Sequence, residues 1–288
     1  MPRHTGTARP TRNGDRTLAY SADAPLLLRM LGWSMNLFRI RGIQLAVHFS
    51  FFLLLAYVAQ AGWADGGLIG MLWQVAILLT FFMCVVLHEF GHSLTAIHFG
   101  VGVRRILLMP IGGMAEFDSI PRQPSRELLI TLAGPAVNFA IAAGLWILVG
   151  IPPGWSPGDF TYPANATGFA QLMLHWNLLM GLFNLVPVFP MDGGRIFRAL
   201  LATRLPYLRA TFVAATVGKL LAALGMVLAF FLFHSPLTAV LFAFIFAAGE
   251  MEYRAVKRRE DNEAHWQAML DRVYAVPPGS DEPPFLGR

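Results

Sequence analysis

Long apolar runs make up most of this chain, and the charged residues gather in the segments between them. A helix that crosses a membrane needs about 20 mostly apolar residues. Runs of this kind occupy residues 42–63, 68–100, 127–151, 169–201, 211–233 and 236–249. The fourth run is interrupted by Pro187 and Pro190, and the sixth is short. The pattern predicts an all-α polytopic membrane protein with about six transmembrane helices.

This map divides the chain into three parts. Residues 1–41 are predicted to form a basic cytoplasmic tail, and residues 42–249 carry the six spans. Residues 250–288 are predicted to form a second cytoplasmic tail. Apolar residues recur within it at helical spacing, which predicts one amphipathic helix; they are Trp266, Met269, Leu270, Val273 and Tyr274.

A further apolar segment, residues 106–117, is too short to span the membrane and is broken by Pro110, Gly112 and Gly113. We expect it to re-enter the membrane as an extended hairpin or loop. Its edge, including Gly112 and Gly113, would then pair with an extended peptide, as in β-strand addition. The alternative is a loop that lies on the membrane surface.

Composition supports the membrane assignment. Hydrophobic residues make up 56% of the chain and charged residues only 14%, whereas soluble domains carry about 25% charged residues. The net charge of +5 in so apolar a chain suggests contact with a lipid bilayer and argues against a nucleic-acid partner. Cys84 is the single cysteine, so an intramolecular disulfide is excluded.

The distribution of basic residues predicts the orientation. Arginine or lysine occurs before the first span, in the second connection and after the last span. The fourth connection is also basic when it is taken to begin at Arg195, at the end of the fourth run. The first, third and fifth connections contain neither. Positively charged loops stay on the cytoplasmic side. We therefore expect a multi-pass protein of the cell (plasma or inner) membrane with both termini in the cytoplasm.

The sharpest chemical feature is His88-Glu89-Phe90-Gly91-His92, an H-E-x-x-H motif inside the second apolar run. On a helix, His88 and His92 lie on one face and reach one metal ion, and Glu89 lies close enough to activate a zinc-bound water. Ionisable groups inside a membrane face the protein interior and need partners. The alternative is a pair of packing histidines, which leaves Glu89 unexplained. The motif lies nearer the cytoplasmic end of its span.

A third ligand must come from elsewhere, because catalytic zinc sites use three protein ligands and keep one position open. Asp192 is the clear candidate, since it lies in an apolar run beside helix-breaking prolines and glycines. Broken backbone is tolerated in a membrane only where it lines protein or water. Asn138 and Asn184 are candidates to contact the substrate or its oxyanion, with hydrogen bonds between helices as the alternative.

Taken together, these motifs resemble those of the site-2 protease family of intramembrane zinc metalloproteases, peptidase family M50. The resemblance rests on four segments in this order: His88–His92, Pro110–Ala115, Gly134–Asn138, and Asn184-x-x-Pro187-x-x-Pro190-x-Asp192-Gly193-Gly194-Arg195. It implies one Zn²⁺ held by His88, His92 and Asp192, with Glu89 as the catalytic acid and base. It also implies a single-span or membrane-anchored protein as substrate, cleaved in or near its transmembrane segment in regulated intramembrane proteolysis.

Two other functions stay open at this point. One is a membrane metalloprotease of another class, for example one that acts on lipidated C-termini, which would not predict the Asp192 motif. The other is a non-enzymatic metal-binding membrane protein. The sequence shows neither a PDZ module between spans nor room for CBS modules in the C-terminal tail, so control through such modules is not expected. Substrate identity and oligomeric state are not predicted.

Overall fold

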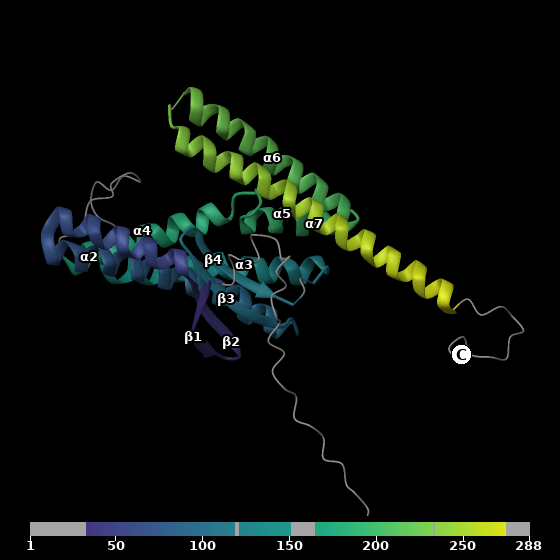
Figure 1. Ribbon diagram of the computed structural model, residues 1–288, viewed down its shortest axis with the longest axis horizontal. Coiled ribbons are helices and arrows are strands. Elements are labelled where there is room, and N and C mark those ends of the chain that lie inside the picture. The colour runs from purple at the N-terminus through teal and green to yellow at the C-terminus, as the bar shows by residue number, and fades with distance from the viewer. Residues whose placement is uncertain (1–32, 119–120, 151–164, 233, 275–288) are drawn as a thin grey trace, which may run out of the picture.

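The computed structural model describes residues 33–118, 121–150, 165–232 and 234–274. Within these residues the chain is mainly helical, with one small sheet (Figure 1). The elements follow in the order β1 (Ser34–Ile40), β2 (Ile43–His48), α2 (Phe49–His98), β3 (Val103–Met109), β4 (Gly112–Phe117), α3 (Pro124–Val149), α4 (Ala166–Asn184), α5 (Asp192–Ala202), α6 (Tyr207–Phe231) and α7 (Pro236–Tyr274).

The long helices confirm a polytopic membrane protein. Among the described residues, α2, α3, α6 and α7 are long and apolar enough to cross a membrane. Helix α2 is interrupted at Gly66 and Gly67, which have non-helical backbone angles. Its two legs fold back on each other, so that Phe51 meets Phe82 edge to face with ring centroids 4.8 Å apart. Helix α2 therefore supplies the first two predicted spans, and α4 covers much of the fourth.

The prediction that the first span begins at residue 42 is wrong, and the fold is not purely helical. Residues Ile43–His48 form strand β2, and β1 lies within the segment expected as a tail. The sheet has the order β1-β2-β3-β4, with β2 and β3 parallel and the other pairs antiparallel. A buried central strand has a continuous apolar sequence, which periodicity does not distinguish from the start of a helix.

The expected hairpin in residues 106–117 is present. Strands β3 and β4 pair antiparallel, with Leu107 opposite Met114 and Met109 opposite Gly112. Gly112 adopts a φ of 135°, which favours glycine in this tight turn. Because β4 is the last strand of the sheet, its outer edge has no strand partner within the described sheet.

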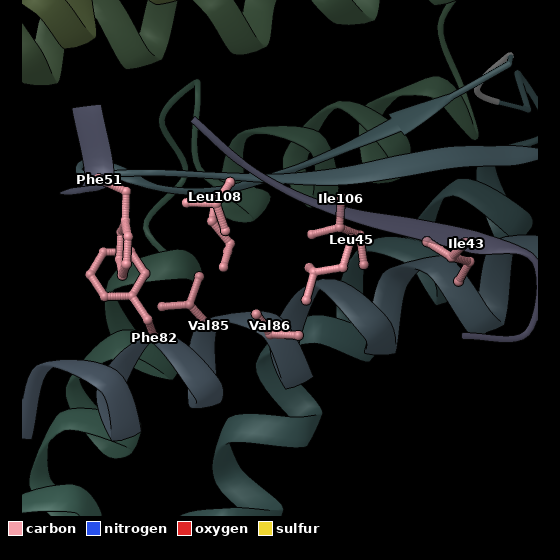
Figure 2. Close-up of a cluster of buried hydrophobic side chains, with 9 residues drawn as sticks. Ile43, Leu45, Phe51, Phe82, Val85, Val86, Ile106 and Leu108 are labelled. Atoms are coloured by element: carbon pink, nitrogen blue, oxygen red, sulfur yellow. The ribbon is translucent and has the colours of Figure 1, made fainter. Parts of the chain in front are cut away.

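A hydrophobic core joins the sheet to the second leg of α2 (Figure 2). Val85 and Val86 of α2 are each 6% exposed. They pack against strands β2 and β3, with core residues Ile43, Leu45, Val47, Phe51, Phe82, Ile106 and Leu108. Since Val85 and Val86 lie three and two residues before His88 on the same helix, this core fixes the position of the H-E-x-x-H turn relative to the hairpin.

The fourth and sixth predicted runs differ from the structure. The fourth run is not one helix, because α4 ends at Asn184 and α5 begins at Asp192 after a non-helical segment that contains Pro187 and Pro190. Proline lacks the backbone N–H that continues a helix. Helix α7 runs without interruption from Pro236 to Tyr274, so the predicted amphipathic helix continues the last span.

Candidate metal centre

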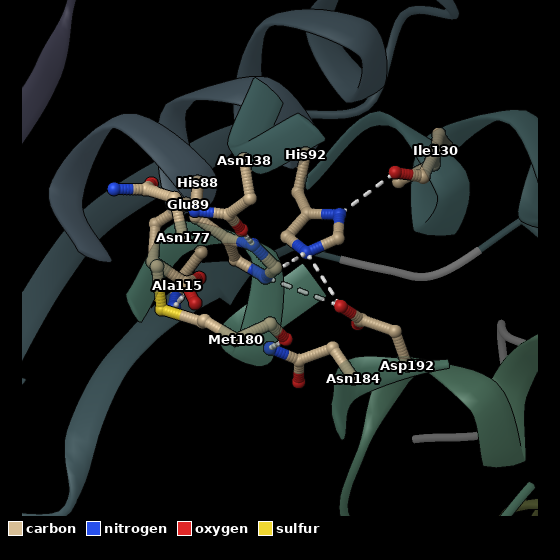
Figure 3. A network of polar contacts seen from close by, with 10 residues as sticks. All are labelled: His88, Glu89, His92, Ala115, Ile130, Asn138, Asn177, Met180, Asn184 and Asp192. Atoms are coloured by element: carbon tan, nitrogen blue, oxygen red, sulfur yellow. Dashed lines mark hydrogen bonds and ion pairs between the residues drawn. The ribbon is translucent and has the colours of Figure 1, made fainter. Parts of the chain in front are cut away.

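Two histidines from α2 and an aspartate from α5 meet inside the protein (Figure 3). His88 Nε2 lies 3.1 Å from His92 Nε2, and Asp192 Oδ2 lies 3.2 Å from each of them. The three residues are 4%, 7% and 9% exposed. The histidines face the same way because residues i and i+4 share one face of a helix. The structure therefore brings together the three residues predicted as metal ligands.

The hydrogen bonds behind His88 determine which of its nitrogens can bind a metal. The chain of bonds ends at the carbonyl of Met173, which can only accept, so Asn177 donates to it through Nδ2 over 2.8 Å. Asn177 Oδ1 then accepts from Asn138 Nδ2 at 2.9 Å. This leaves Asn138 Oδ1 to accept from His88 Nδ1. With its proton on Nδ1, His88 presents an Nε2 lone pair to the centre.

His92 is fixed in the same tautomer by a simpler contact. Its Nδ1 donates to the backbone carbonyl of Ile130 in α3 over 2.8 Å. Both imidazoles thus direct an unprotonated Nε2 toward the Asp192 carboxylate. Three acceptor atoms so close together repel one another unless a cation lies among them.

The spacing of these atoms fits zinc. Ligands about 2.0–2.1 Å from a tetrahedral zinc ion lie about 3.3 Å from one another. The observed separations of 3.1 and 3.2 Å are close to that value. Two imidazoles and one carboxylate also form a donor set typical of catalytic zinc sites.

One glycine in α3 and one in α2 allow the close packing around the imidazoles. A Cβ atom on Gly134 would lie 2.2 Å from His92 Nε2 and 2.8 Å from His88 Nε2. A Cβ atom on Gly91 in α2 would lie 2.6 Å from the carbonyl oxygen of Ala133. The two helices therefore approach closely because neither has a side chain at these points.

Glu89 connects the metal ligands to the hairpin. Its Oε2 accepts a hydrogen bond of 3.1 Å from the backbone N–H of Ala115 in β4. Gly113 packs against the same side chain, because a Cβ atom there would lie 2.7 Å from Glu89 Cγ. The carboxylate is thus held between the metal ligands and the outer strand of the sheet.

A cavity of about 900 Å³ opens beside these groups. It is bounded by the β3–β4 hairpin, the end of α4, the start of α5 and the first turns of α7. Most of the residues predicted from the sequence line it, namely His88, Glu89, His92, Gly112, Gly113, Asn184 and Asp192. Asn138 differs, because it is fully buried behind His88 and lies outside the cavity.

Ile130 and Asn177 contribute to the site and were not predicted from the sequence. The carbonyl of Ile130 gives no side-chain signal, so only the packing of α3 against α2 reveals it. Asn177 was detectable in principle, since it is a polar residue in an apolar run, as are Asn138 and Asn184. It is 1% exposed and orients Asn138.

The chain is similar in sequence to known proteins. The model of peptidase family M50 matches residues 76–164 and 159–232, which together span more than half of the chain. A zinc metalloprotease of Methanocaldococcus jannaschii is 38% identical over 229 residues, which is 79% of this chain and 62% of that protein. Stage IV sporulation protein FB of Bacillus subtilis is 26% identical over 199 residues, covering 68% of this chain and 64% of that protein.

A solved structure is similar as well. The site-2 protease from Methanocaldococcus jannaschii aligns with a TM-score of 0.54 and 36% sequence identity. The alignment covers 77% of this chain and 95% of that one. The matched part of the chain covers less than two thirds of the length of the zinc metalloprotease and of the sporulation protein described above.

Proposed function

Since this chain belongs to peptidase family M50, we propose that it is a zinc endopeptidase that hydrolyses a peptide bond in or next to a transmembrane segment of another protein. The observation that carries the proposal is the position of Glu89 between the three metal ligands and the unpaired edge of a strand. That arrangement places a proton acceptor, a metal site and a peptide-binding edge around one cavity. The relative named as a zinc metalloprotease supports it.

His88, His92 and Asp192 would hold the zinc ion. When bound there, zinc would polarise a water molecule and the scissile carbonyl. Glu89 accepts the proton of the attacking water and passes it to the leaving amine. Its bond to the Ala115 N–H keeps the carboxylate oriented toward the cavity throughout.

The outer edge of β4 is the proposed binding site for the substrate backbone. In an antiparallel pair, alternate residues direct their backbone groups away from the partner strand. The Ala115 N–H points outward to Glu89, so Gly113, two residues earlier, shares that edge. An unwound substrate segment paired with β4 would have its carbonyls close to Glu89. Gly112 supplies the turn that places this edge at the cavity.

The two asparagines predicted to contact substrate have different roles in this proposal. Asn184 lines the cavity, and its Nδ2 uses one hydrogen on the Met180 carbonyl over 3.0 Å. The second N–H and the carbonyl oxygen are left to bind the substrate backbone. Asn138 instead positions His88 from behind, because its Oδ1 contacts the Nδ1 of that ring.

The substrate is proposed to be a single-span or membrane-anchored protein, released by regulated intramembrane proteolysis. The apolar lining from α7, which includes Leu237, Leu241 and Phe244, suits a segment that arrives from the bilayer. We propose that both termini are cytoplasmic and that the active site lies within the membrane nearer that side. The Asp192 ligand and the family membership favour this function over an enzyme acting on lipidated C-termini. Glu89 favours it over a non-enzymatic metal carrier.

The test is a Glu89→Gln variant expressed in the native membrane. An uncleaved single-span protein should accumulate relative to wild type, while the zinc content of the purified variant stays unchanged. Glu116→Gln is the matched control, because Glu116 is also held by the hairpin but pairs with Arg105 at 2.8 Å. Identical membrane proteomes for wild type and Glu89→Gln would contradict the proposal.

A further inference from the structure

A buried ion network joins α5, the helix that begins with Asp192, to α3 and α7. It consists of Glu127 in α3, Arg198 in α5 and Glu252 in α7. Arg198 Nε lies 2.9 Å from Glu127 Oε1, and Arg198 Nη1 lies 2.5 Å from Glu252 Oε1. Glu127 and Arg198 are each only 1% exposed.

Stability alone is a weak explanation for this network. Removing charged groups from water costs free energy for each ion, and apolar replacements of buried ion pairs are often as stable or more so. The network is also incompletely satisfied, because Glu127 Oε2 is buried without a hydrogen-bond partner. Buried polar groups kept at such a cost often fix one particular arrangement of the elements that carry them.

The elements joined by Arg198 are those that set the geometry of the metal centre. Helix α5 has 11 residues and begins with Asp192, and the segment before it is not helical. Its placement therefore depends on packing with its neighbours. Helix α3, which carries Glu127, also carries the Ile130 carbonyl that holds His92. The Arg198–Glu127 contact thus links the helix of the aspartate to the helix that orients the histidines.

Arg198 also contacts the chain on the other side of Asp192. Its guanidinium lies 5.3 Å from the ring centroid of Phe189, three residues before the aspartate. It lies 5.1 Å from the ring of Tyr207 at the start of α6. A guanidinium over an aromatic face is an attractive contact, and it is stronger where water is excluded. One side chain therefore holds the segments before and after Asp192.

We propose that Arg198 is a positioning residue that holds Asp192 at the distance from His88 and His92 that zinc coordination requires. It acts by fixing α5 against α3 through Glu127 and against α7 through Glu252. The inference rests on the metal centre of the proposed function. It concerns the geometry of zinc binding and not the cleavage step.

The experiment compares Arg198→Met with Lys219→Met in the full-length protein in detergent micelles. Lys219 pairs with Glu250 at 2.9 Å and joins α6 to α7, so its loss removes a partly exposed ion pair between helices that contains no residue of α5. The readouts are the zinc dissociation constant by chelator competition, the visible spectrum of the Co²⁺-loaded protein, and thermal unfolding. Loss of groups that orient metal ligands typically weakens metal affinity about 10–100-fold.

We expect Arg198→Met to weaken zinc binding at least tenfold and to change the Co²⁺ absorption bands, because Asp192 no longer coordinates in the same position. Lys219→Met should lower the unfolding temperature while affinity and spectrum stay within error of wild type. Arg198→Lys should be intermediate, since it keeps the charge but loses the fork that reaches both carboxylates.

An Arg198→Met protein with unchanged zinc affinity and an unchanged Co²⁺ spectrum would overturn the inference, and the network would then be only stabilising. If Arg198→Met does not fold, Glu252→Gln provides the same test from the more exposed end of the network. A wild-type protein that binds zinc but cleaves no membrane protein would contradict the proposed function and leave this inference intact.

Discussion

The two sides of the metal centre are built in different ways. His88 and His92 lie one turn apart on a single helix, so their relative position follows from helix geometry. Asp192 lies 104 residues after His88, at the start of a short helix that follows a non-helical segment. The histidine side is therefore set mainly by local structure, whereas the aspartate side depends on how α5 packs. Three glycines allow each side, and the Glu89 carboxylate beside them, to be disturbed separately.

Gly134→Ala should have the largest effect, because it disturbs both histidines at once. The new Cβ would lie 2.2 Å from His92 Nε2 and 2.8 Å from His88 Nε2, so the imidazoles must move. We expect zinc affinity to fall more than about 100-fold, beyond the range seen for loss of supporting contacts. Gly144→Ala is the control on the same helix, since nothing lies within 4 Å of its Cβ position. Equal zinc affinity in the two variants would show that the histidine side tolerates displacement.

Gly193→Ala disturbs the aspartate side and should have the next largest effect. The Cβ would lie 2.1 Å from the Val186 carbonyl oxygen, so the backbone beside Asp192 must shift. We expect a loss of zinc affinity of about 10–100-fold, as for other changes that misplace one ligand. Gly218→Ala approaches the same segment more gently, at 3.3 Å from Val188 Cα, and should change affinity less. A Gly193→Ala loss equal to that of Gly134→Ala would mean that the two sides are equally constrained.

Gly113→Ala should have the smallest effect on zinc binding and a clear effect on turnover. Its Cβ would lie 2.7 Å from Glu89 Cγ and 3.1 Å from Val85 Cγ1, so we expect the Glu89 carboxylate to be displaced while the ligands stay in place. We expect zinc affinity within about twofold of wild type and a cleavage rate reduced about 100-fold, as for misplaced catalytic groups. Gly66→Ala, with nothing within 4 Å, is the control. A parallel loss of zinc in Gly113→Ala would indicate that the hairpin supports the metal centre itself.

The differences between prediction and structure also divide into features set by local sequence and features set by packing between elements. The helical spans and the hairpin were predictable because each is encoded in a continuous stretch of residues. The strand Ile43–His48 was not, because a strand buried in the middle of a sheet and the start of a membrane helix have similar apolar sequences. Asn138 was predicted to contact substrate, with hydrogen bonds between helices as the alternative, because it is a polar residue in an apolar run. Its actual partner, His88, comes from another helix and becomes evident only after packing.

The sequence by itself determined the membrane class, the H-E-x-x-H turn and Asp192 as the third candidate ligand. These features depend on composition, on helical spacing and on the scarcity of carboxylates in apolar runs. Only the tertiary structure decided which nitrogen of each histidine faces the centre, how Glu89 meets the edge of β4, and how Arg198 connects α5 to α3. The physical reason is that each of these contacts joins side chains or backbone groups from different elements. Their distances are set by packing across the fold and not by spacing along the chain.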